Sequence, residues 1–511
     1  MRKKYKLLSF VLMILSVTFL TTSCNFLDIF SSLINNENSE SIPDYSEESE
    51  SIPEGANYYR DTYSKYTYYD MGQKSLYGAK AQKAIGDQKT LVIPVSIKGF
   101  EKYATASTRK RIEKAFFGTE KDTGWESVSS YFYKSSYGKL NLTGEVTPWF
   151  EIGLTPFQIT TKNFEDAADL GTTYVLNKAV EWAKKQGYKM TDYDLDKDGY
   201  IDSVWLVYGA PNSTNYVYTK SVQELMWAFT YWDYSNLNNG SKTNPVPNVY
   251  AWASFDFMDV GKNNGISIDA HTYIHEQGHV FGLEDYYDYD SLHSPLGCVD
   301  MQDYNVGDHN AYSKYALGWL KPYAVTGDCE ITIKPSALYG DAILVGNSKS
   351  NAFDEYLLIE FLTPEGVWNQ DSKSEYPSIR SKTYTTPGVR ILHVDARLIT
   401  HDDEITTSMD NKHLYAHAYS NTPSESYSAG TRTLRNDLLA LVSADNDSRF
   451  QTNEQEVANN SSLFQKGMTF DIADYNSFFK YAKLHNGQTI PYEITIKNIT
   501  NESATISFET K

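Results

Sequence analysis

Three histidines stand four residues apart, at positions 271, 275 and 279, and a glycine follows at position 282. Residues four apart lie on the same face of an α-helix, so this spacing predicts a helix with its imidazoles on one side. A glycine ends such a helix readily because it can take the left-handed conformation that turns the chain back. The stretch therefore predicts a helix, a sharp turn at Gly282 and an acidic loop beyond it.

The second and third of these histidines form an H-E-x-x-H motif, His275-Glu276-x-x-His279. On a helix both imidazoles can reach one metal ion, while Glu276 projects beside them toward a bound water. Catalytic zinc takes three protein ligands and leaves a fourth position open, so one more donor is needed. Asp285 is our candidate for it, at the place where metzincins have a third histidine. Two neighbouring acids, or a more distant glutamate, are its rivals: Glu284 and Asp288. A polar helix face without any metal is the alternative to the whole interpretation.

Further residues around this motif are candidates for supporting roles. His271 lies one turn before His275, and we interpret it as a structural or supporting residue. Met301 follows the motif after a short loop, as the methionine turn beneath a metzincin zinc does. Tyr304 and His309 are candidates for a donor that stabilises an oxyanion, although each suits a structural role as well.

A second acidic stretch, "DLDKDGYID", has the spacing of the first nine positions of an EF-hand calcium loop. The candidate ligands are four carboxylates and one backbone carbonyl: Asp194, Asp196, Asp198, Tyr200 and Asp202. Trp205 stands at position twelve, where a complete EF-hand has a bidentate glutamate. So many carboxylates repel one another without a cation, which favours structural calcium over a solvated acidic turn.

The order of elements predicts an α/β domain followed by a β-rich, β-sandwich-like C-terminal region. Apolar runs at 90–100 and 203–210 are typical of buried strands, and residues 164–188 form a long amphipathic pattern that ends at Gly187. After Trp319 short strand patterns alternate with turns. They include "CEITIKP", "EYLLIEF", "GVRILHVDA", "YEITIKNIT" and "SATISFET". We place the first domain at 57–325 and the second at 326–511, with residues 401–460 as long loops.

The first 24 residues predict export of the rest of the chain. Basic residues precede an apolar run at 7–20, which is shorter than the ~20 residues of a membrane span. Cys24 follows small and hydroxyl residues as in a bacterial lipobox, except that Thr21 replaces the usual leucine. Residues 25–56 are rich in Ser, Glu and Asn and predict a disordered tether. We expect a protein at the bacterial cell surface, anchored through a lipid at Cys24, or a secreted one.

The composition of the chain limits the classes of partner that it can bind. The chain has 65 Asp and Glu against 46 Lys and Arg, a formal net charge of -19, which opposes binding to nucleic acid or anionic lipid. Two cysteines remain after Cys24, and in an oxidising compartment such a pair more often forms a disulfide. We therefore expect Cys298 and Cys329 to be joined, with buried free thiols as the alternative. We expect a monomer whose only link to a membrane is the lipid.

With these motifs in place, "IHEQGHVFGLEDYYD" resembles the signature of the immune inhibitor A family of secreted bacterial metallopeptidases. Further segments across about 88–322 are similar to that family: "TLVIPVSIKGF", "SVSSYFYKSSYGKLNLTGEVTPWF", "DLDKDGYIDSVWLVYGA" and "AYSKYALGWLKP". The resemblance implies a metzincin-like zinc peptidase fold, with His275, His279 and Asp285 as zinc ligands and Glu276 as catalytic acid and base. The chain departs from the family at Glu284, where proline is frequent, and in lacking a large segment before the first strand.

These expectations combine into a zinc endopeptidase that acts on extracellular proteins, with zinc and structural calcium as its ions. The alternative is a non-catalytic surface lipoprotein, an adhesin or glycan binder on a peptidase-derived fold. Glu276 favours the enzyme because a binding relic needs no general base beside metal ligands. Zinc capture for uptake, a third possibility, would favour a closed site rich in histidine.

Overall fold

The computed structural model describes most of the chain from residue 52 onward: residues 52–75, 78–164, 171–236, 238–346, 350–377, 381–400, 402, 404–410, 416–425, 436–446, 448–453 and 456–511. The chain divides into two compact units, Met1–Glu48 and Ser49–Lys511, and every described residue belongs to the second. The export signal, Cys24 and most of the predicted tether lie outside the described residues. Among the described residues, no helix has both the length and the apolar character to cross a membrane.

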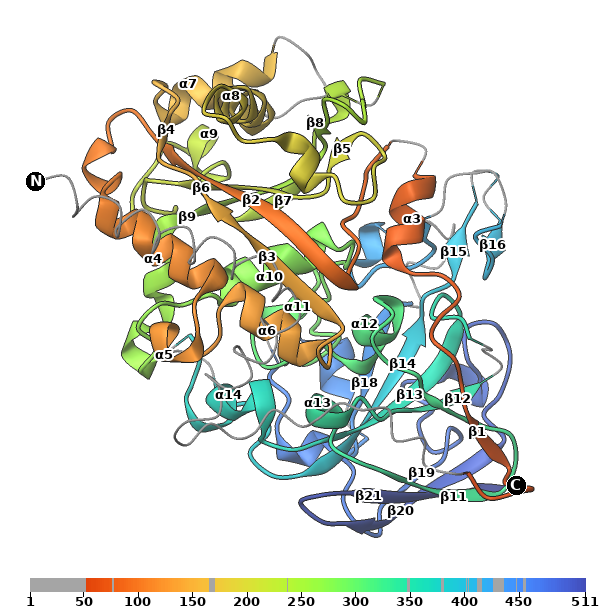
Figure 1. The fold of residues 1–511 in the computed structure, drawn as a ribbon. Helices are drawn as coiled ribbons and strands as arrows, with labels where there is room; N and C mark the ends of the chain where they lie inside the picture. The colour runs from red at the N-terminus through yellow and green to blue at the C-terminus, as the bar shows by residue number, and fades with distance from the viewer. Residues whose placement is uncertain are drawn as a thin grey trace, which may run out of the picture. The chain divides into compact units, whose positions relative to one another are not determined.

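A sheet of mainly parallel strands forms the centre of the first part of this unit (Figure 1). Its order is β3-β2-β6-β9-β7, and β4 also pairs with β2. The strands are β2 (Gly86–Ser96), β3 (Leu140–Val146), β4 (Phe150–Glu151), β6 (Val204–Tyr208), β7 (Phe229–Trp232) and β9 (Val249–Ser254). Only β7 runs antiparallel to its neighbour, β9, at the edge of the sheet. Central strands such as β6 are wholly buried, as strands covered on both faces are.

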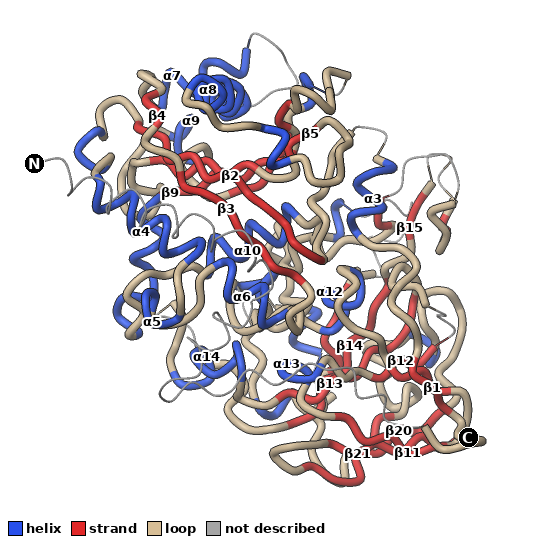
Figure 2. Tube along the Cα trace, viewed as in Figure 1, coloured by secondary structure: helices blue, strands red, loops and turns tan. Residues whose placement is uncertain are grey.

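Helices cover both faces of this sheet (Figures 1 and 2). On one face the apolar side of α8 (Gly171–Lys185) shares a core with β2, β6 and β9. On the other face Trp205 of β6 contacts Phe116 of α4 (Ala106–Phe117) and Tyr273 of α10 (His271–Val280). The other helices of this part are α5 (Glu120–Thr123), α6 (Val128–Ser135), α7 (Pro156–Thr160), α9 (Lys220–Gln223), α11 (Met301–Tyr304) and α12 (Ala311–Ala316). The helix with the histidine motif is thereby packed on the sheet.

Two antiparallel-rich sheets share one apolar core in the C-terminal part, as the sequence predicted for a β-sandwich-like region. Their orders are β1-β10-β12-β13-β14-β18 and β11-β21-β20-β19. The first contains β1 (Tyr58–Arg60), β10 (Tyr323–Val325), β12 (Ile343–Gly346), β13 (Glu355–Leu362), β14 (Gly388–Asp395) and β18 (Leu439–Val442). The second contains β11 (Cys329–Ile333), β19 (Thr469–Phe470), β20 (Tyr492–Ile499) and β21 (Ala504–Thr510). Ile359 and Ile391 of the first sheet meet Ile494 and Ile506 of the second in this core.

Smaller elements connect these layers. They are α3 (Tyr68–Lys74), α13 (Ser336–Tyr339), α14 (Asn369–Lys373), the pair β5 (Tyr200–Ile201) and β8 (Val246–Pro247), and a small sheet of β15 (Leu398–Ile399), β16 (Ile405–Thr406) and β17 (Ala416–His417). The structure is thus mixed α/β with several sheets.

The structure differs from the sequence prediction at the domain boundary and in the loop region. β1 and β10 both fall within 57–325, yet they pair with each other in the C-terminal sheet. Within 401–460, β18 is a fully buried strand, although its four residues are too few to stand out from the polar sequence around them. Neither pairing has a local sequence signal, because each strand meets partners far away in the chain.

The expected disulfide between Cys298 and Cys329 is wrong, since the two cysteines are not joined. Cys298 is buried in the loop before α11, where its sulfur lies 3.8 Å from the hydroxyl of Ser294. Cys329 is the first residue of β11, on the sandwich. The two side chains therefore belong to different elements with different neighbours, and the prediction from cysteine count failed for that reason.

Candidate metal centre

The predicted helix and turn are both present at the histidine motif. α10 spans His271–Val280, and Gly282 follows with a positive φ of 97°. The amide of Gly282 donates to the carbonyl of His279, and the amide of Leu283 donates to that of Gly278. These two bonds form a Schellman motif, which reverses the chain directly after the helix. The reversal brings the acidic loop back beside the histidines.

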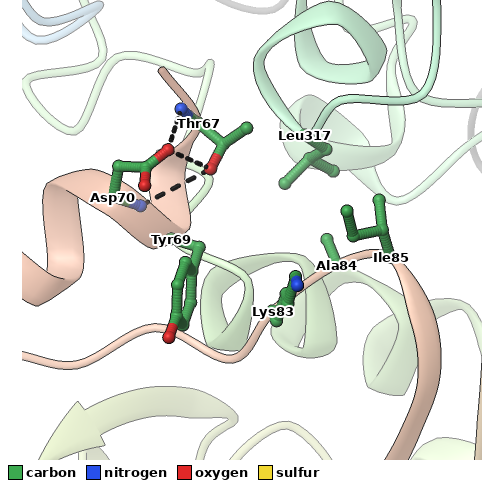
Figure 3. A pocket seen from close by; sticks show the side chains of 7 residues that line it. All are labelled: Thr67, Tyr69, Asp70, Lys83, Ala84, Ile85 and Leu317. Atoms are coloured by element: carbon green, nitrogen blue, oxygen red, sulfur yellow. Dashed lines mark hydrogen bonds between the residues drawn. The ribbon is translucent and has the colours of Figure 1, made fainter. Parts of the chain in front are cut away.

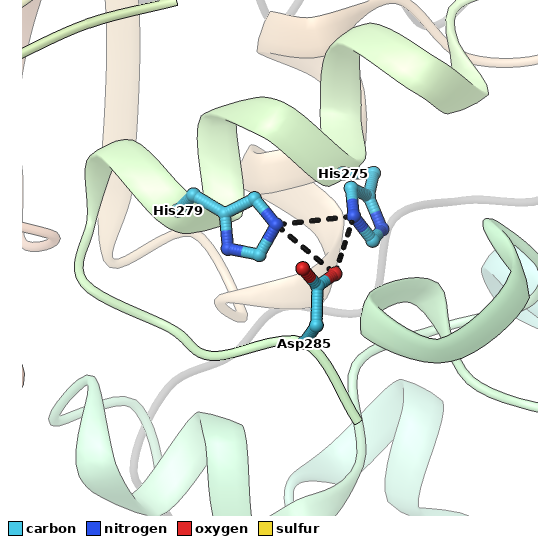
Figure 4. Close-up of side chains that lie close together, drawn as sticks. All are labelled: His275, His279 and Asp285. Atoms are coloured by element: carbon cyan, nitrogen blue, oxygen red, sulfur yellow. Dashed lines mark hydrogen bonds and ion pairs between the residues drawn. The ribbon is translucent and has the colours of Figure 1, made fainter. Parts of the chain in front are cut away.

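Three ligand atoms converge at this reversal (Figure 4). The Nε2 atoms of His275 and His279 lie 3.1 Å apart. Oδ1 of Asp285 lies 2.9 Å from the first and 3.2 Å from the second. Ligands about 2.0–2.1 Å from a tetrahedral zinc ion would be separated by about 3.3 Å, so the spacing suits zinc. Asp285 thus joins the two histidines, as predicted.

Backbone carbonyls fix which nitrogen of each ring faces the centre. Nδ1 of His275 lies 2.8 Å from the carbonyl oxygen of Met301, and Nδ1 of His279 lies 2.7 Å from that of Leu283. A carbonyl only accepts, so each Nδ1 carries the hydrogen, and in a neutral ring Nε2 then has a bare lone pair. Carbonyl partners of this kind are typical of metal-binding histidines. Met301, the predicted methionine turn, therefore contacts the site through its backbone.

This arrangement needs a positive charge at its centre. Oδ1 of Asp285 is buried and accepts no hydrogen bond, although it faces two ring nitrogens that are bare when the rings are neutral. Burial alone would lower the pKa of His279, but the charge of Asp285 outweighs burial and raises this pKa to about 10. The three electron-pair donors therefore hold either a proton on a ring or a metal ion. Their number and chemistry fit zinc.

Glu276 is buried next to these ligands. Its Oε2 accepts a hydrogen bond of 3.1 Å from the hydroxyl of Thr230 on β7, and the same hydroxyl lies 2.9 Å from the carbonyl oxygen of Glu276. Burial raises the pKa of Glu276, while the charges of His279 and His275 lower it in part. A carboxylate whose pKa is shifted toward neutrality is suited to accept and return a proton.

Tyr304 and His309, the candidates for a donor that stabilises an oxyanion, lie in different surroundings. Tyr304 ends α11 and is half-buried, with its ring 6.3 Å from the ring of Tyr287. His309 is buried, and its ring nitrogens lie 3.0 Å from the hydroxyl of Tyr131 and 3.2 Å from Oε1 of Gln302. Burial lowers the pKa of His309 well below its usual value, so the ring is neutral. With both nitrogens engaged, His309 has the environment of a structural residue.

His271 does not join the metal ligands. Its ring is stacked between Trp125 and Tyr376, with centroid distances of 3.8 and 3.9 Å. Its Nδ1 lies 2.8 Å from Oδ1 of Asp269, and its Nε2 lies 3.5 Å from Oδ2 of Asp371. The structural role predicted for His271 agrees with this position.

The rival acids of Asp285 lie elsewhere. Glu284 is exposed and belongs to none of the metal-compatible groups among the described residues. Asp288 accepts from the backbone of Asp290 and Leu292, and its Oδ2 lies 2.8 Å from Nδ1 of His293. Asp285 is accordingly the acid that the fold brings to the two histidines.

The acidic loop before β5 brings three carboxylates together. Asp194, Asp196 and Asp202 each place an oxygen within 4.8 Å of the others. Gly199 takes a φ of 96° at the tight turn. Burial, together with the neighbouring aspartates, raises the pKa of Asp202 to about 8. A divalent cation would relieve this repulsion.

Two of the predicted ligands of this loop, Asp198 and Asp196, also have protein partners. Asp198 lies 3.3 Å from Nζ of Lys80, and its Oδ1 accepts from the amide of Tyr200. Asp196 accepts from the hydroxyl of Tyr69 on α3 at 2.8 Å. The loop is thus connected to the N-terminal segment of the described chain.

A third group, Glu355, His393 and His485, also has metal-compatible spacing. Here, however, the acid already has hydrogen-bond donors on both oxygens. Oε1 of Glu355 accepts from the amide of His485 at 2.5 Å and lies 3.0 Å from Nε2 of His393. Its Oε2 accepts from the amide of Asn486 and lies 3.2 Å from the guanidinium of Arg397. This cluster is satisfied without an ion, which distinguishes it from the group at Asp285.

Sequence reasoning missed two tyrosines and a threonine at the candidate centre. The hydroxyl of Tyr289 donates to Oδ2 of Asp285, and the ring of Tyr287 lies 6.5 Å from that of His275. The tyrosines in "DYYDYD" were a visible signal, since a phenol four residues after a carboxylate can reach it. Thr230 gave no signal, because only the sheet brings β7 beside α10.

A pocket of about 220 Å³ lies beside α3 (Figure 3), and Tyr69 in its wall also donates to Asp196 of the acidic loop. Thr67, Lys83 and Leu317 are among the residues that line it, and no member of the metal-compatible groups found among the described residues does. Asp70, also in its wall, is engaged in the capping box of α3 with Thr67. The pocket therefore adds nothing to the metal chemistry.

Comparison of the sequence with models of known protein families found no match, and comparison with curated proteins found none. The resemblance to the immune inhibitor A family stays a prediction from the motifs.

Proposed function

We propose that the chain is a zinc-dependent endopeptidase that hydrolyses peptide bonds of extracellular proteins. The observation that carries this proposal is the convergence of three electron-pair donors, His275, His279 and Asp285, beside the buried carboxyl group of Glu276. A site that only stored metal would gain nothing from a buried acid with a raised pKa next to the ligands.

In the proposed reaction the zinc ion, Glu276 and Thr230 each have a separate role. A bound zinc ion would supply Lewis acidity and bring the pKa of a bound water to about 7. Glu276 accepts the proton of the attacking water and passes it to the leaving amine, because its carboxyl group lies beside the ligands. Thr230 orients Glu276 for this exchange through its hydrogen bond to Oε2.

Strand β7 offers a place for an extended peptide. It is the edge strand of its sheet, is half-exposed along its length, and pairs with β9 alone among the described strands. An edge strand can hold a peptide through main-chain hydrogen bonds that do not depend on sequence. Because Thr230 of β7 contacts Glu276, a peptide on this edge would pass the metal ligands.

The family, fold, location and second ion of the protein are part of the same proposal. We place the protein in the immune inhibitor A family with a metzincin-like fold, and at the bacterial surface or in the medium after export. Calcium at Asp194, Asp196 and Asp202 would join the loop before β5 to its neighbours. The substrates would be extracellular proteins, and the enzyme would act as a monomer.

Cleavage of casein by the purified chain tests the proposal, with zinc content measured in parallel. Glu276→Gln should keep its zinc and lose about 100- to 10,000-fold in rate, the usual contribution of a general acid and base. Asp285→Asn should lose zinc, whereas its matched control Glu284→Gln should keep both zinc and activity. Absence of zinc from the wild type under zinc-replete conditions would sink the proposal.

A non-catalytic surface binding lipoprotein is the second candidate, supported by the large β-rich part. It predicts a chain that holds zinc but cleaves neither casein nor any other unfolded protein, with or without Glu276.

A further inference from the structure

The hydroxyl of Tyr289 occupies the outer oxygen of the candidate metal-binding carboxylate. It donates to Oδ2 of Asp285, while Oδ1 of the same residue faces His275 and His279. The two oxygens of one carboxylate are thus held in different environments. Tyr289 is 52% exposed, so burial in the core does not explain its position.

The β-rich part of the chain anchors Tyr289 through its backbone. The amide of Tyr289 donates to the buried hydroxyl of Thr422 at 2.8 Å. The adjacent Asn421 donates its side-chain amide to the carbonyl oxygen of Tyr286 at 2.8 Å. On the other side, the ring of Tyr289 meets the ring of Tyr287 edge-on, at 5.1 Å between centroids. The backbone and the ring of Tyr289 are therefore both held in place, and its hydroxyl is positioned to donate to Asp285.

The binding mode of this carboxylate matters for the proposed reaction. A carboxylate can offer a cation one oxygen or both, and a second oxygen would take a coordination position that water or substrate needs. A hydrogen bond to the outer oxygen stabilises the mode in which only the inner oxygen faces the ion. Hydrogen bonds of this kind orient metal ligands and tune the ion they hold.

We propose that Tyr289 is a positioning residue that holds Asp285 to the metal through Oδ1 alone, and that Thr422 supports it from the β-rich part. This inference rests on the proposed function, because it assigns Tyr289 a role at the same centre. Because the hydroxyl of Tyr289 donates to the candidate ligand Asp285, its removal should change metal binding first and peptide binding less.

Tyr289→Phe removes only the hydroxyl, and the full chain is used throughout. Zinc affinity is measured by chelator competition, and the coordination of the ion is followed by the visible absorption spectrum of the cobalt form. We expect zinc affinity to fall by about 10- to 100-fold, the usual effect of losing such a partner. We also expect a weaker cobalt absorption as the second oxygen joins the ion, and a loss in kcat with little change in KM.

Tyr216→Phe is the matched control, since Tyr216 is 47% exposed and its ring contacts Phe100 and Tyr218. Thr422→Val is a second variant that keeps the phenol and frees the loop, and it should weaken zinc binding less than Tyr289→Phe does.

The outcomes separate the two proposals. Zinc affinity and a cobalt spectrum unchanged in Tyr289→Phe, with zinc binding lost in His275→Ala, would overturn the role of Tyr289 and leave the metal centre standing. Failure of the wild type to bind either ion would overturn the metal centre itself. Weaker zinc binding and an altered cobalt spectrum in Tyr289→Phe, with Tyr216→Phe unchanged, would support the inference.

Discussion

His271 should act as a buried cation that stabilises the start of α10, the helix that carries His275 and His279. Its two ring nitrogens face carboxylates on either side, Asp269 at 2.8 Å and Asp371 at 3.5 Å. Aromatic rings of Trp125 and Tyr376 cover both faces of the imidazole, and such faces attract a positive charge. Burial alone would lower the pKa of His271, but the two carboxylates outweigh burial and raise it from 6.5 to about 9.

The size and sign of the contribution of His271 to folding stability follow from its raised pKa. A rise from 6.5 to about 9 corresponds to about 3 kcal/mol of stability, at about 1.4 kcal/mol for each pKa unit. Because the pKa is higher in the folded state, the contribution is fully present below pH 6.5 and is lost as the pH rises through about 9. This is a large share of the ~5–15 kcal/mol by which proteins are stable.

Urea unfolding of the wild type and His271→Gln at a series of pH values measures the effect. Glutamine keeps a planar amide in the site but no charge, so the difference in free energy of unfolding isolates the imidazolium from other titrating groups. That difference should be about 3 kcal/mol larger at about pH 6 than at about pH 9.5. A difference that does not change with pH, or an NMR signal of the His271 ring that titrates near pH 6.5, would show that the buried ring is neutral.

Two further predictions concern ion binding away from the histidine motif. Removal of calcium with EGTA should lower the melting temperature of the wild type but not that of Asp202→Asn, because Asp202 is one of the three carboxylates at the candidate site. Equal melting curves of the wild type with and without EGTA would contradict the calcium assignment. Glu355→Gln should lower the free energy of unfolding by about 3–5 kcal/mol, because Arg397 and His393 lose a buried charged partner. The zinc content should stay unchanged. A fall in zinc content would instead assign a metal to that cluster.

Local patterns in the sequence predicted the elements that carry the candidate metal ligands. The spacing of His275 and His279 requires only one helical turn, and Gly282 followed by Asp285 requires only one chain reversal. The strands of the C-terminal sheets were predictable for the same reason, since β13 and β14 are each short segments dominated by apolar residues. The partners that hold these elements were not predictable. Asp371 and Thr422 reach the motif from more than ninety residues away, and nothing in their own surroundings marks them.

Those distant partners bear on what the β-rich part does. It contacts the segment between His271 and His293 at several separate places, on both sides of the candidate ligands. Asp371 meets His271 ahead of them, while Thr422 and Asp437 meet Tyr289 and His293 behind them. His293 lies 2.8 Å from both Asp288 and Asp437, a bridge of two acids and one imidazole like that at His271. Two such bridges, one on each side, hold the helix and the loop that supply His275, His279 and Asp285. The β-rich part is therefore a structural component of the candidate metal centre, and this favours one integrated unit over two parts that are merely joined in sequence.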